Sequence, residues 1–374
     1  MGIFNPMTTT YLDYNATAPV WPEVVEAVSQ GLAASGNASS VHSEGRAARQ
    51  MVEEAREKVA ALVNARPGQV IFTGGGTEAN NLAMWQAELS GVTVSPIEHE
   101  SVLKPLEHAA RLRVQSDGVV DVNSLPEHLD GLVSVMLANN ETGVLQPVKR
   151  LAELCRERGV AVHTDAIQAV GKINVDWRDL GVQMMSISAH KLGGPQGVGA
   201  LIVDDTWGGR PLLRGGGQER GRRAGTENIA GITGFGVAAE LVQKNFVAMA
   251  NVTALRDMLE HGLRAIDPTV IIHGGKVERL PNTVCASMPG VDAETQVMSL
   301  DLAGVMVSAG SACSSGKVTT SHVLKAMGLD DASASSAIRI SLGWHSTPDD
   351  VEKCLTAWRD LYTRTRWTQA AAAE

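Results

Sequence analysis

The sequence predicts an α/β protein with a large domain built on a mostly parallel sheet and a smaller α/β domain at its C-terminal end. Between Tyr11 and Val203, short apolar runs alternate with amphipathic stretches, which is the pattern of repeated strand–helix–strand units. The 374 residues are enough for two unequal cores. Beyond residue 265, strand-like and helix-like pieces alternate again, so we expect the smaller domain there.

The first expected elements are two helices, followed by a series of strands. Residues 22–32 carry proline in the first turn, where its missing N–H is tolerated. Residues 44–65 have apolar side chains at helical spacing and charges of alternating sign. Six apolar runs of strand length are then expected to form strands: residues 70–73, 92–95, 132–138, 160–164, 184–188 and 200–203.

Two further helices lead to the expected domain boundary. Residues 148–158 predict a helix that ends at Gly159, because glycine suits the left-handed conformation after a helix C-terminus. Residues 237–265 predict one long helix that bridges to the second domain. We therefore expect residues 11–250 to form the large domain, and residues 251–374 with the N-terminal segment 1–20 to form the small one.

The composition, 44% apolar and 20% charged, is that of an ordinary globular protein. A net charge of −9 argues against nucleic acid or anionic membranes as partners. The four cysteines are widely spaced, so we expect neither a structural zinc site nor disulfides, and a reducing compartment. The first residues lack the basic and apolar parts of a secretion signal, and no apolar run is long enough for a bilayer. A cytoplasmic protein is expected.

The run TGGGTEANN, residues 73–81, lies between an expected strand and an expected helix. Glycines let backbone N–H groups approach an anion, and a helix N-terminus favours negative charge, so Gly76 and Thr77 are candidates for holding a phosphate. A plain glycine turn with Thr77 as the helix cap explains the run equally well.

A carboxylate and a lysine follow two of the expected strands. Asp165 and Gln168 end the segment VAVHTDAIQ, and Lys191 comes 26 positions later (191 − 165) in SISAHK. Ligands bind beyond the carboxyl ends of parallel strands. With a phosphate loop nearby, this set suits pyridoxal phosphate (PLP), which needs a Schiff-base lysine and a carboxylate at its ring nitrogen. Taken singly, Lys191 would be a surface lysine and Asp165 a turn residue.

His99 and Thr226 lie in segments that allow several interpretations. In PIEHES, His99 follows a strand and could lie on a cofactor ring or move protons, while a structural histidine is the alternative. Neighbouring Glu98 and Glu100 suggest a metal site, which no second histidine supports. Residues 212–231, rich in arginine and glycine, could bind RNA, hold a phosphate through Thr226, or form a flexible loop. The acidic chain argues against RNA.

Two residues in the C-terminal part suggest chemistry on a small substrate. Cys313, in SAGSACSSGK, lies among small flexible residues, so we expect an exposed and mobile nucleophile. Arg339 alternates with apolar residues on a strand-like run, and such an inward arginine suits a bidentate grip on a substrate carboxylate.

Together, the segments YLDYNATAP, GNASSVHSEGRAAR, TGGGTEANN, EHES, NNETG, HTDAIQAVGK, SISAHKLGGPQGVGAL, RAGTEN and GSACSSG resemble the NifS and IscS type of cysteine desulfurase, within the class V aminotransferases. The resemblance runs from about Tyr11 past Arg339, with the motifs in the expected order. It implies the PLP-dependent transferase fold called fold type I and a homodimer. The sequence departs from the family pattern at Tyr14, at Gly76 and at Trp344-His345, where Asn, Ala and Arg-Phe are common.

The resemblance also implies a role for each candidate residue. Lys191 would form the Schiff base, Asp165 would face the ring nitrogen, His99 would stack on the ring and Gln168 would contact the ring hydroxyl. The residues implied to hold the phosphate are Gly76, Thr77, Ser188 and His190, with Thr226 reaching it from the other subunit. Asn140 and Arg339 would hold the substrate carboxylate. No metal is expected in the resting chain, although Cys313 would ligate an iron–sulfur cluster during transfer.

The implied activity is the conversion of L-cysteine to L-alanine, with the sulfur left on Cys313 as a persulfide. Lys191 would remove the α-proton, and His99 is one candidate to accept the thiol proton. The implied partners are sulfur acceptors, such as an iron–sulfur scaffold or a thiolation relay. An aminotransferase or a selenocysteine lyase would share Lys191 and Asp165, and a docking scaffold with weak turnover is a further alternative.

Overall fold

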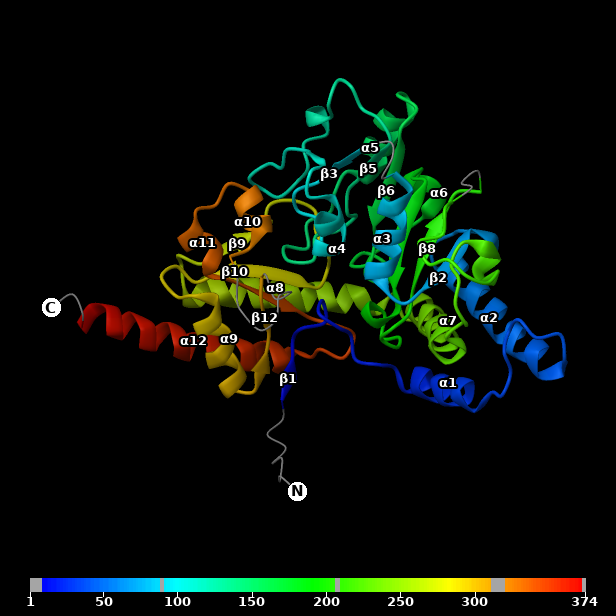
Figure 1. Ribbon diagram of the computed structural model, residues 1–374. Coiled ribbons are helices and arrows are strands. Elements are labelled where there is room, and N and C mark those ends of the chain that lie inside the picture. The colour runs from blue at the N-terminus through cyan, green and yellow to red at the C-terminus, as the bar shows by residue number, and fades with distance from the viewer. Residues whose placement is uncertain (1–8, 88–90, 206–208, 311–319, 372–374) are drawn as a thin grey trace.

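The computed structural model describes residues 9–87, 91–205, 209–310 and 320–371 (Figure 1). Cys313 lies outside these ranges. The described helices are α1 (Pro22–Ala33), α2 (Ser43–Leu62), α3 (Gly76–Ala87), α4 (Glu100–Leu103), α5 (Val148–Arg156), α6 (Trp177–Leu180), α7 (Ile229–Lys244), α8 (Ala248–Ile266), α9 (Ala293–Leu302), α10 (His322–Ala326), α11 (Asp331–Ser335) and α12 (Pro348–Ala371). None of them carries an apolar stretch sufficient to span a bilayer.

A seven-stranded sheet forms the centre of the larger part of the molecule. Its order is β2 (Val70–Thr73), β8 (Gly199–Val203), β7 (Met184–Ser188), β6 (Ala161–Asp165), β5 (Leu132–Ser134), β3 (Val92–Val94) and β4 (Ala110–Arg111). Only β8 runs antiparallel to its neighbours in this sheet. All six expected strands are present, and the prediction of a mostly parallel sheet is confirmed. One strand is shorter than predicted, because β5 ends at Ser134 and the expected strand extended to residue 138. Beyond β5, the N–H of Met136 donates to the buried Glu98 carboxylate.

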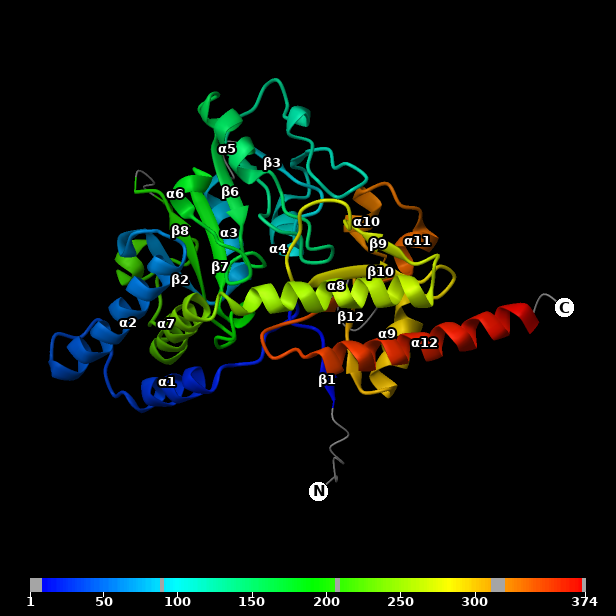
Figure 2. The ribbon, with the colours of Figure 1, turned by 180° about the vertical axis from the view of Figure 1, so that it is seen from behind.

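Helices cover both faces of this sheet because successive strand residues point to opposite sides. In β2, Phe72 packs into a core shared with α1, α2, α5 and α7, whereas Ile71 packs into a second layer with α3 and α4. The apolar face of α2 has the expected helical spacing, since Ala48, Val52, Ala55 and Val59 are all buried. The result is three layers, helix, sheet and helix (Figures 1 and 2).

A second, smaller core lies in the C-terminal part. It is built on the antiparallel sheet β12 (Ser308–Ala309), β13 (Ala337–Ser341), β10 (Thr283–Ser287) and β9 (Ile271–His273), packed against α8, α9 and α12. The N-terminal segment joins this part, because β1 (Thr10–Tyr11) pairs in parallel with β11 (Val305–Met306). Leu12 belongs to the second core, whereas Val24 belongs to the first. The domain limits given above remain a prediction, because the first core also includes Cys285 and Ala337.

The prediction of a single helix over residues 237–265 is wrong. The chain forms α7 and α8 instead, and the side chain of Asn245 donates to the carbonyl of Leu241 where α7 ends. The break has a packing reason, since Val242 belongs to the first core and Met249 to the second. Figure 2 shows α8 leading away from α7 toward the small antiparallel sheet.

Candidate active site

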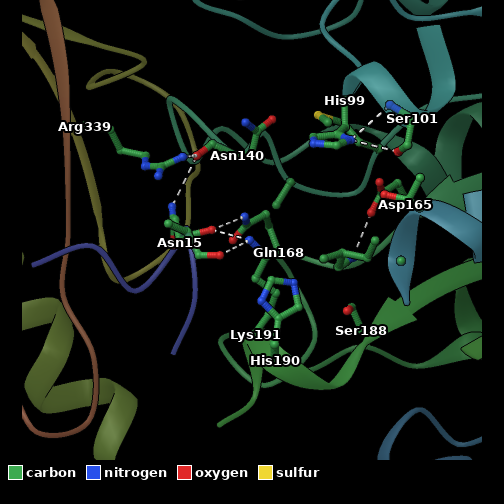
Figure 3. A pocket seen from close by; sticks show the side chains of 16 residues that line it. Asn15, His99, Ser101, Asn140, Asp165, Gln168, Ser188, His190, Lys191 and Arg339 are labelled. Carbon is green, nitrogen blue, oxygen red and sulfur yellow. Dashed lines mark hydrogen bonds between the residues drawn. The ribbon is translucent and has the colours of Figure 1, made fainter. Parts of the chain in front are cut away.

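A cavity of about 310 Å³ lies beyond the carboxyl ends of β6 and β7, where the parallel topology predicts a ligand site (Figure 3). Of the predicted site residues that the structure describes, all except Thr226 line the cavity, namely Gly76, Thr77, His99, Asn140, Asp165, Gln168, Ser188, His190, Lys191 and Arg339. Cys313 lies outside the described residues. Thr226 is exposed in the segment before α7 and does not line the cavity.

Asp165 lies at the end of β6 and is almost fully buried. Its two carboxylate oxygens accept hydrogen bonds from the Asn80 amide at 2.7 Å and from the N–H of Ile167 at 2.9 Å. Burial raises the pKa of this carboxyl, and the two hydrogen bonds, with the charges of His99 and Lys191, offset part of the rise. A cation beside Asp165 would therefore stabilise its ionised form.

Lys191 lies in the short 3₁₀ turn Ala189–Lys191 that follows β7. Its Nζ donates to the carbonyl oxygens of Asn15 at 2.5 Å and of Ala16 at 2.7 Å. The segment YLDYNATAP thus reaches the site from the N-terminal part of the chain. Asn15 is buried, and spacing alone did not mark it as a site residue.

A second lysine, Lys172, lies behind the cavity. Its Nζ donates to the side chains of Gln168 at 2.6 Å and of Asn15 at 2.9 Å. Burial, and after it the charges of Lys191 and Arg339, lower the pKa of Lys172 well below its ordinary value. Gln168 also donates to the Asn15 carbonyl at 2.9 Å, so its amide orientation is fixed. Asn282 donates to the side-chain oxygen of Asn15 as well, at 3.1 Å, so two of the four residues that donate to Asn15 are lysines.

His99 lines the cavity from the N-terminus of α4, where it is the capping residue. Burial is the largest cause that lowers its pKa. Glu98 beside it is fully buried, and its carboxylate accepts the N–H of Met136 at 2.7 Å. A metal site at Glu98 and Glu100 gains no support. In the described part of the chain, no three acidic, histidine or cysteine side chains lie close enough together to bind a metal ion.

The run TGGGTEANN connects β2 to α3, which begins at Gly76. Thr77 lies inside the helix, so the interpretation of Thr77 as its cap is wrong. A Cβ on Gly76 would come within 2.3 Å of the Ile167 side chain. The Oγ of Ser188 is buried near the start of α3, and it neither donates nor accepts a hydrogen bond among the described residues.

Arg339 lies on β13 and reaches the cavity from the small sheet. Its guanidinium donates to the Asp13 carboxylate at 2.9 Å and to the carbonyl oxygen of Asn140 at 3.1 Å (Figure 3 shows the latter). The inward arginine therefore has an anionic partner inside the protein, and that partner, Asp13, was not predicted. The Oδ1 of Asn140 is buried without a hydrogen-bond partner among the described residues.

The arginine-rich segment that contains Thr226 is anchored to the large sheet. Glu219 is buried, although its φ of 47° is a left-handed value that non-glycine residues seldom adopt. Its carboxylate accepts two hydrogen bonds from Arg56, at 2.7 and 2.8 Å. Arg223 pairs with Glu78 at 2.8 Å. These contacts anchor the segment at Glu219 and Arg223, and the Arg223 charge is paired inside the protein.

The chain has clear relatives among known proteins. The family model described as aminotransferase class-V matches residues 10–354. A cysteine desulfurase IscS of Dictyoglomus turgidum is 40% identical over 95% of each chain. The NifS-like protein of Rickettsia africae is similar in structure, with a TM-score of 0.89 and 34% identity over 95% of this chain and 99% of that one. A structure described as SspA in complex with cysteine has a TM-score of 0.78 and 30% identity over 91% and 100% of the two chains.

These similarities extend over nearly the whole chain and agree with the three-layer fold and with the cavity at the end of its parallel strands. The fold class expected from the sequence, the PLP-dependent transferase fold type I, is confirmed. The chain therefore belongs to the class-V aminotransferase family and, within it, to the cysteine desulfurases of the NifS and IscS type.

Proposed function

We propose that this chain uses PLP to take the sulfur atom of L-cysteine onto Cys313 and to release L-alanine. The observation that carries the proposal is the convergence of Lys191, Asp165 and Arg339 on one cavity in a member of the cysteine desulfurase family. A relative whose structure was solved with cysteine supports the choice of substrate.

The residues around the cavity fit PLP. Lys191 offers the amine and Asp165 the carboxylate that this cofactor needs, from the ends of adjacent strands. The start of α3 at Gly76 offers N–H groups to a phosphate. Nearby, the buried Oγ of Ser188 has no hydrogen-bond partner within the described ranges. When bound, PLP supplies an electron sink that makes the substrate α-carbon acidic.

The chain's own residues would bind and deprotonate the substrate. Arg339 and the side chain of Asn140 would hold the substrate carboxylate, because a guanidinium can donate two parallel hydrogen bonds to it. Lys191 would remove the α-proton, with its amine guided by the carbonyl oxygens of Asn15 and Ala16. Gln168 and His190 would complete the cofactor site.

Cys313 would then accept the sulfur. Its thiolate would attack the sulfur of the substrate, so that an S–S bond forms as the substrate C–S bond breaks. The β-carbon would then take up one proton, and the α-carbon would regain the proton that Lys191 removed, which gives alanine. The other three cysteines are unsuited to this role, because Cys155, Cys285 and Cys354 are buried. Burial raises the pKa of the Cys155 thiol to about 11 and that of Cys354 to about 12.

The proposal includes the partners implied by the family. The persulfide on Cys313 would pass to an acceptor in the cytoplasm, such as an iron–sulfur scaffold or a thiolation relay, and the iron–sulfur cluster would be cargo of this transfer. A second copy of the chain would bring its Thr226 to the phosphate, which agrees with the exposure of Thr226.

A Cys313→Ser variant tests the sulfur step. The purified variant should bind PLP and show its yellow colour, yet form no protein persulfide and no alanine from L-cysteine. Cys354→Ala is the matched control and should keep both products. Unchanged alanine formation by Cys313→Ser would contradict the proposal, and formation of a keto acid would indicate an aminotransferase instead.

A further inference from the structure

We infer that Asn80 and Ser101 are positioning residues that hold His99 as the neutral tautomer with its proton on Nε2, so that His99 donates a hydrogen bond toward the cavity and does not accept a proton there. The inference rests on the proposed function only for what occupies the cavity. The tautomer itself follows from hydrogen bonds within the protein.

The first argument is the helix cap. His99 precedes α4, and its Nδ1 accepts the backbone N–H of Ser101 at 3.1 Å. A backbone N–H can only donate, so Nδ1 must present its lone pair and cannot carry a proton. In a neutral imidazole the proton is then on Nε2.

The second argument is a chain of side-chain hydrogen bonds that leads back to Asp165. The Nδ2 of Asn80 donates to an Asp165 oxygen at 2.7 Å and to the Oγ of Ser101 at 2.9 Å. An ionised carboxylate only accepts, so it fixes which side of the amide faces it. Because the Ser101 hydroxyl already accepts from Asn80, its own proton is available to Nδ1 of His99, 2.8 Å away. Two donors thus converge on one ring nitrogen.

Protonation of His99 is opposed by the same geometry. A second proton would have to occupy Nδ1, where the N–H of Ser101 cannot reverse its direction. The charges of Asp165 and Glu100 favour the imidazolium form, and those of Lys191 and His322 oppose it, while burial is the largest effect and the pKa is lowered.

The consequence for the reaction is a division of roles. His99 is excluded as the acceptor of the Cys313 thiol proton, although the sequence made it a candidate. It is suited instead to donate a hydrogen bond from Nε2 to an electronegative atom of the cofactor or substrate. Asn80 joins this donor to Asp165 through Ser101, so the two groups share one hydrogen-bonded chain.

The test is nuclear magnetic resonance of the ring nitrogens, on protein labelled with ¹⁵N-histidine, with and without PLP. His99→Gln identifies the signals. We expect a pyridine-type Nδ1 and a pyrrole-type Nε2 for His99 from pH 6 to pH 8. Ser101→Ala should raise the pKa of His99 by about one unit, because it removes one donor to the neutral form. Ser101→Thr should restore the wild-type value.

Two further variants separate this effect from a general loss of structure. Asn80→Ala should also raise the pKa of His99. Asn81→Ala, which removes the hydrogen bond from Asn81 to the Ser101 carbonyl, should not. A proton on Nδ1 in the wild-type protein overturns the inference, as does a His99 titration that is identical in wild type, Ser101→Ala and Asn80→Ala. Failure to bind PLP or to form alanine would count against the proposed function alone, because the tautomer of His99 is measured in the protein both with and without PLP.

Discussion

Arg339 is shared between an internal anion and the cavity. One terminal nitrogen binds Asp13 and the other binds the Asn140 carbonyl, while its Nε is buried without a partner among the described residues. Asp13 also accepts from Ser308 at 2.7 Å, so the carboxylate itself is held in place. The planar guanidinium is therefore fixed before a substrate arrives, which reduces the entropy lost on binding.

The variant Arg339→Lys should raise KM for L-cysteine roughly 10- to 100-fold, because a charge-assisted hydrogen bond contributes about 1.5–3 kcal/mol and lysine cannot form the two parallel bonds. Steady-state kinetics with alanine as the product measures the effect. Arg279→Lys is the control, since Arg279 pairs with Glu260 and does not line the cavity. An unchanged KM for Arg339→Lys would rule out a role in substrate binding.

At the scale of elements, Glu141 links the NNETG segment to the start of α10. Ser321 caps α10 by accepting the N–H of Leu324 at 3.1 Å, and its hydroxyl donates to the Glu141 carboxylate at 2.5 Å. Glu141 is buried, and burial raises its pKa to about 7, against the opposing effects of Ser321 and Arg339. The contact between these two segments thus involves a carboxyl that titrates near neutral pH.

This raised pKa gives a definite sign to the pH dependence of stability. The folded protein binds the proton more tightly than the unfolded chain, so the contribution is complete below about pH 4.5 and is lost as the pH rises through about 7. It amounts to about 3 kcal/mol, since one pKa unit corresponds to about 1.4 kcal/mol. Between pH 5 and pH 8, the free energy of unfolding in urea should therefore fall by about 2.5 kcal/mol less in Glu141→Gln than in wild type.

Exposed Glu107 offers the control for this measurement, because Glu107→Gln should keep the wild-type pH dependence. If the free energy of unfolding changed with pH in the same way in wild type and Glu141→Gln, Glu141 would be charged throughout this pH range.

The strands of the large sheet could be predicted from sequence because they are buried on both faces and are therefore continuously apolar. The break between α7 and α8 could not. No glycine or proline occurs among residues 245–247, and the helical pattern continues through them. What divides the helix is packing, since Val242 and Met249 contact different cores.

Residue types at expected strand ends marked Asp165 and Lys191 as candidates, and both line the cavity, whereas Ser188 was named only through the family resemblance. Asp13, Asn15 and Asn80 were missed, although all three lie in segments that carried the family resemblance. Their partners are far away in sequence, and the spacing of residues gives no information about such contacts. Asp13, for example, binds Arg339 across 326 positions.

At the scale of the whole molecule, an aromatic cluster joins the N-terminal segment to both cores. Trp21 stacks on Trp344 with centroids 4.4 Å apart, and its Nε1 donates to the carbonyl of Leu192, next to Lys191. Tyr14 meets Trp344 edge to face at 5.4 Å. Tyr14 and Trp344 are two of the positions where the sequence was expected to depart from the family pattern, and the structure places them in contact.

A double-mutant cycle tests whether this cluster acts as one unit. For Tyr14→Ala and Trp344→Ala, we expect a coupling free energy of about 0.5–1.5 kcal/mol, because aromatic pairs of this geometry contribute that much beyond burial. Urea unfolding of the two single variants and the double variant gives the value. A cycle between Tyr14 and Trp85, whose ring packs under Arg210, should give a value near zero. Strict additivity for Tyr14 and Trp344 would show that they are independent.

The pairing of Thr10 with Val305 sets an order of events during synthesis. A ribosome adds about 5–20 residues per second, so the first strand waits roughly 15–60 s for its partner to be made. The carbonyls of Asn15 and Ala16 accept from Lys191, and Asn15 itself is held by Asn282 and Thr283. These two residues are also made late, so Asn15 lacks them during most of the synthesis. The large sheet can form earlier, since its last strand ends at Val203. The order of synthesis therefore allows the large sheet to form before the contacts that complete the lysine pocket are available.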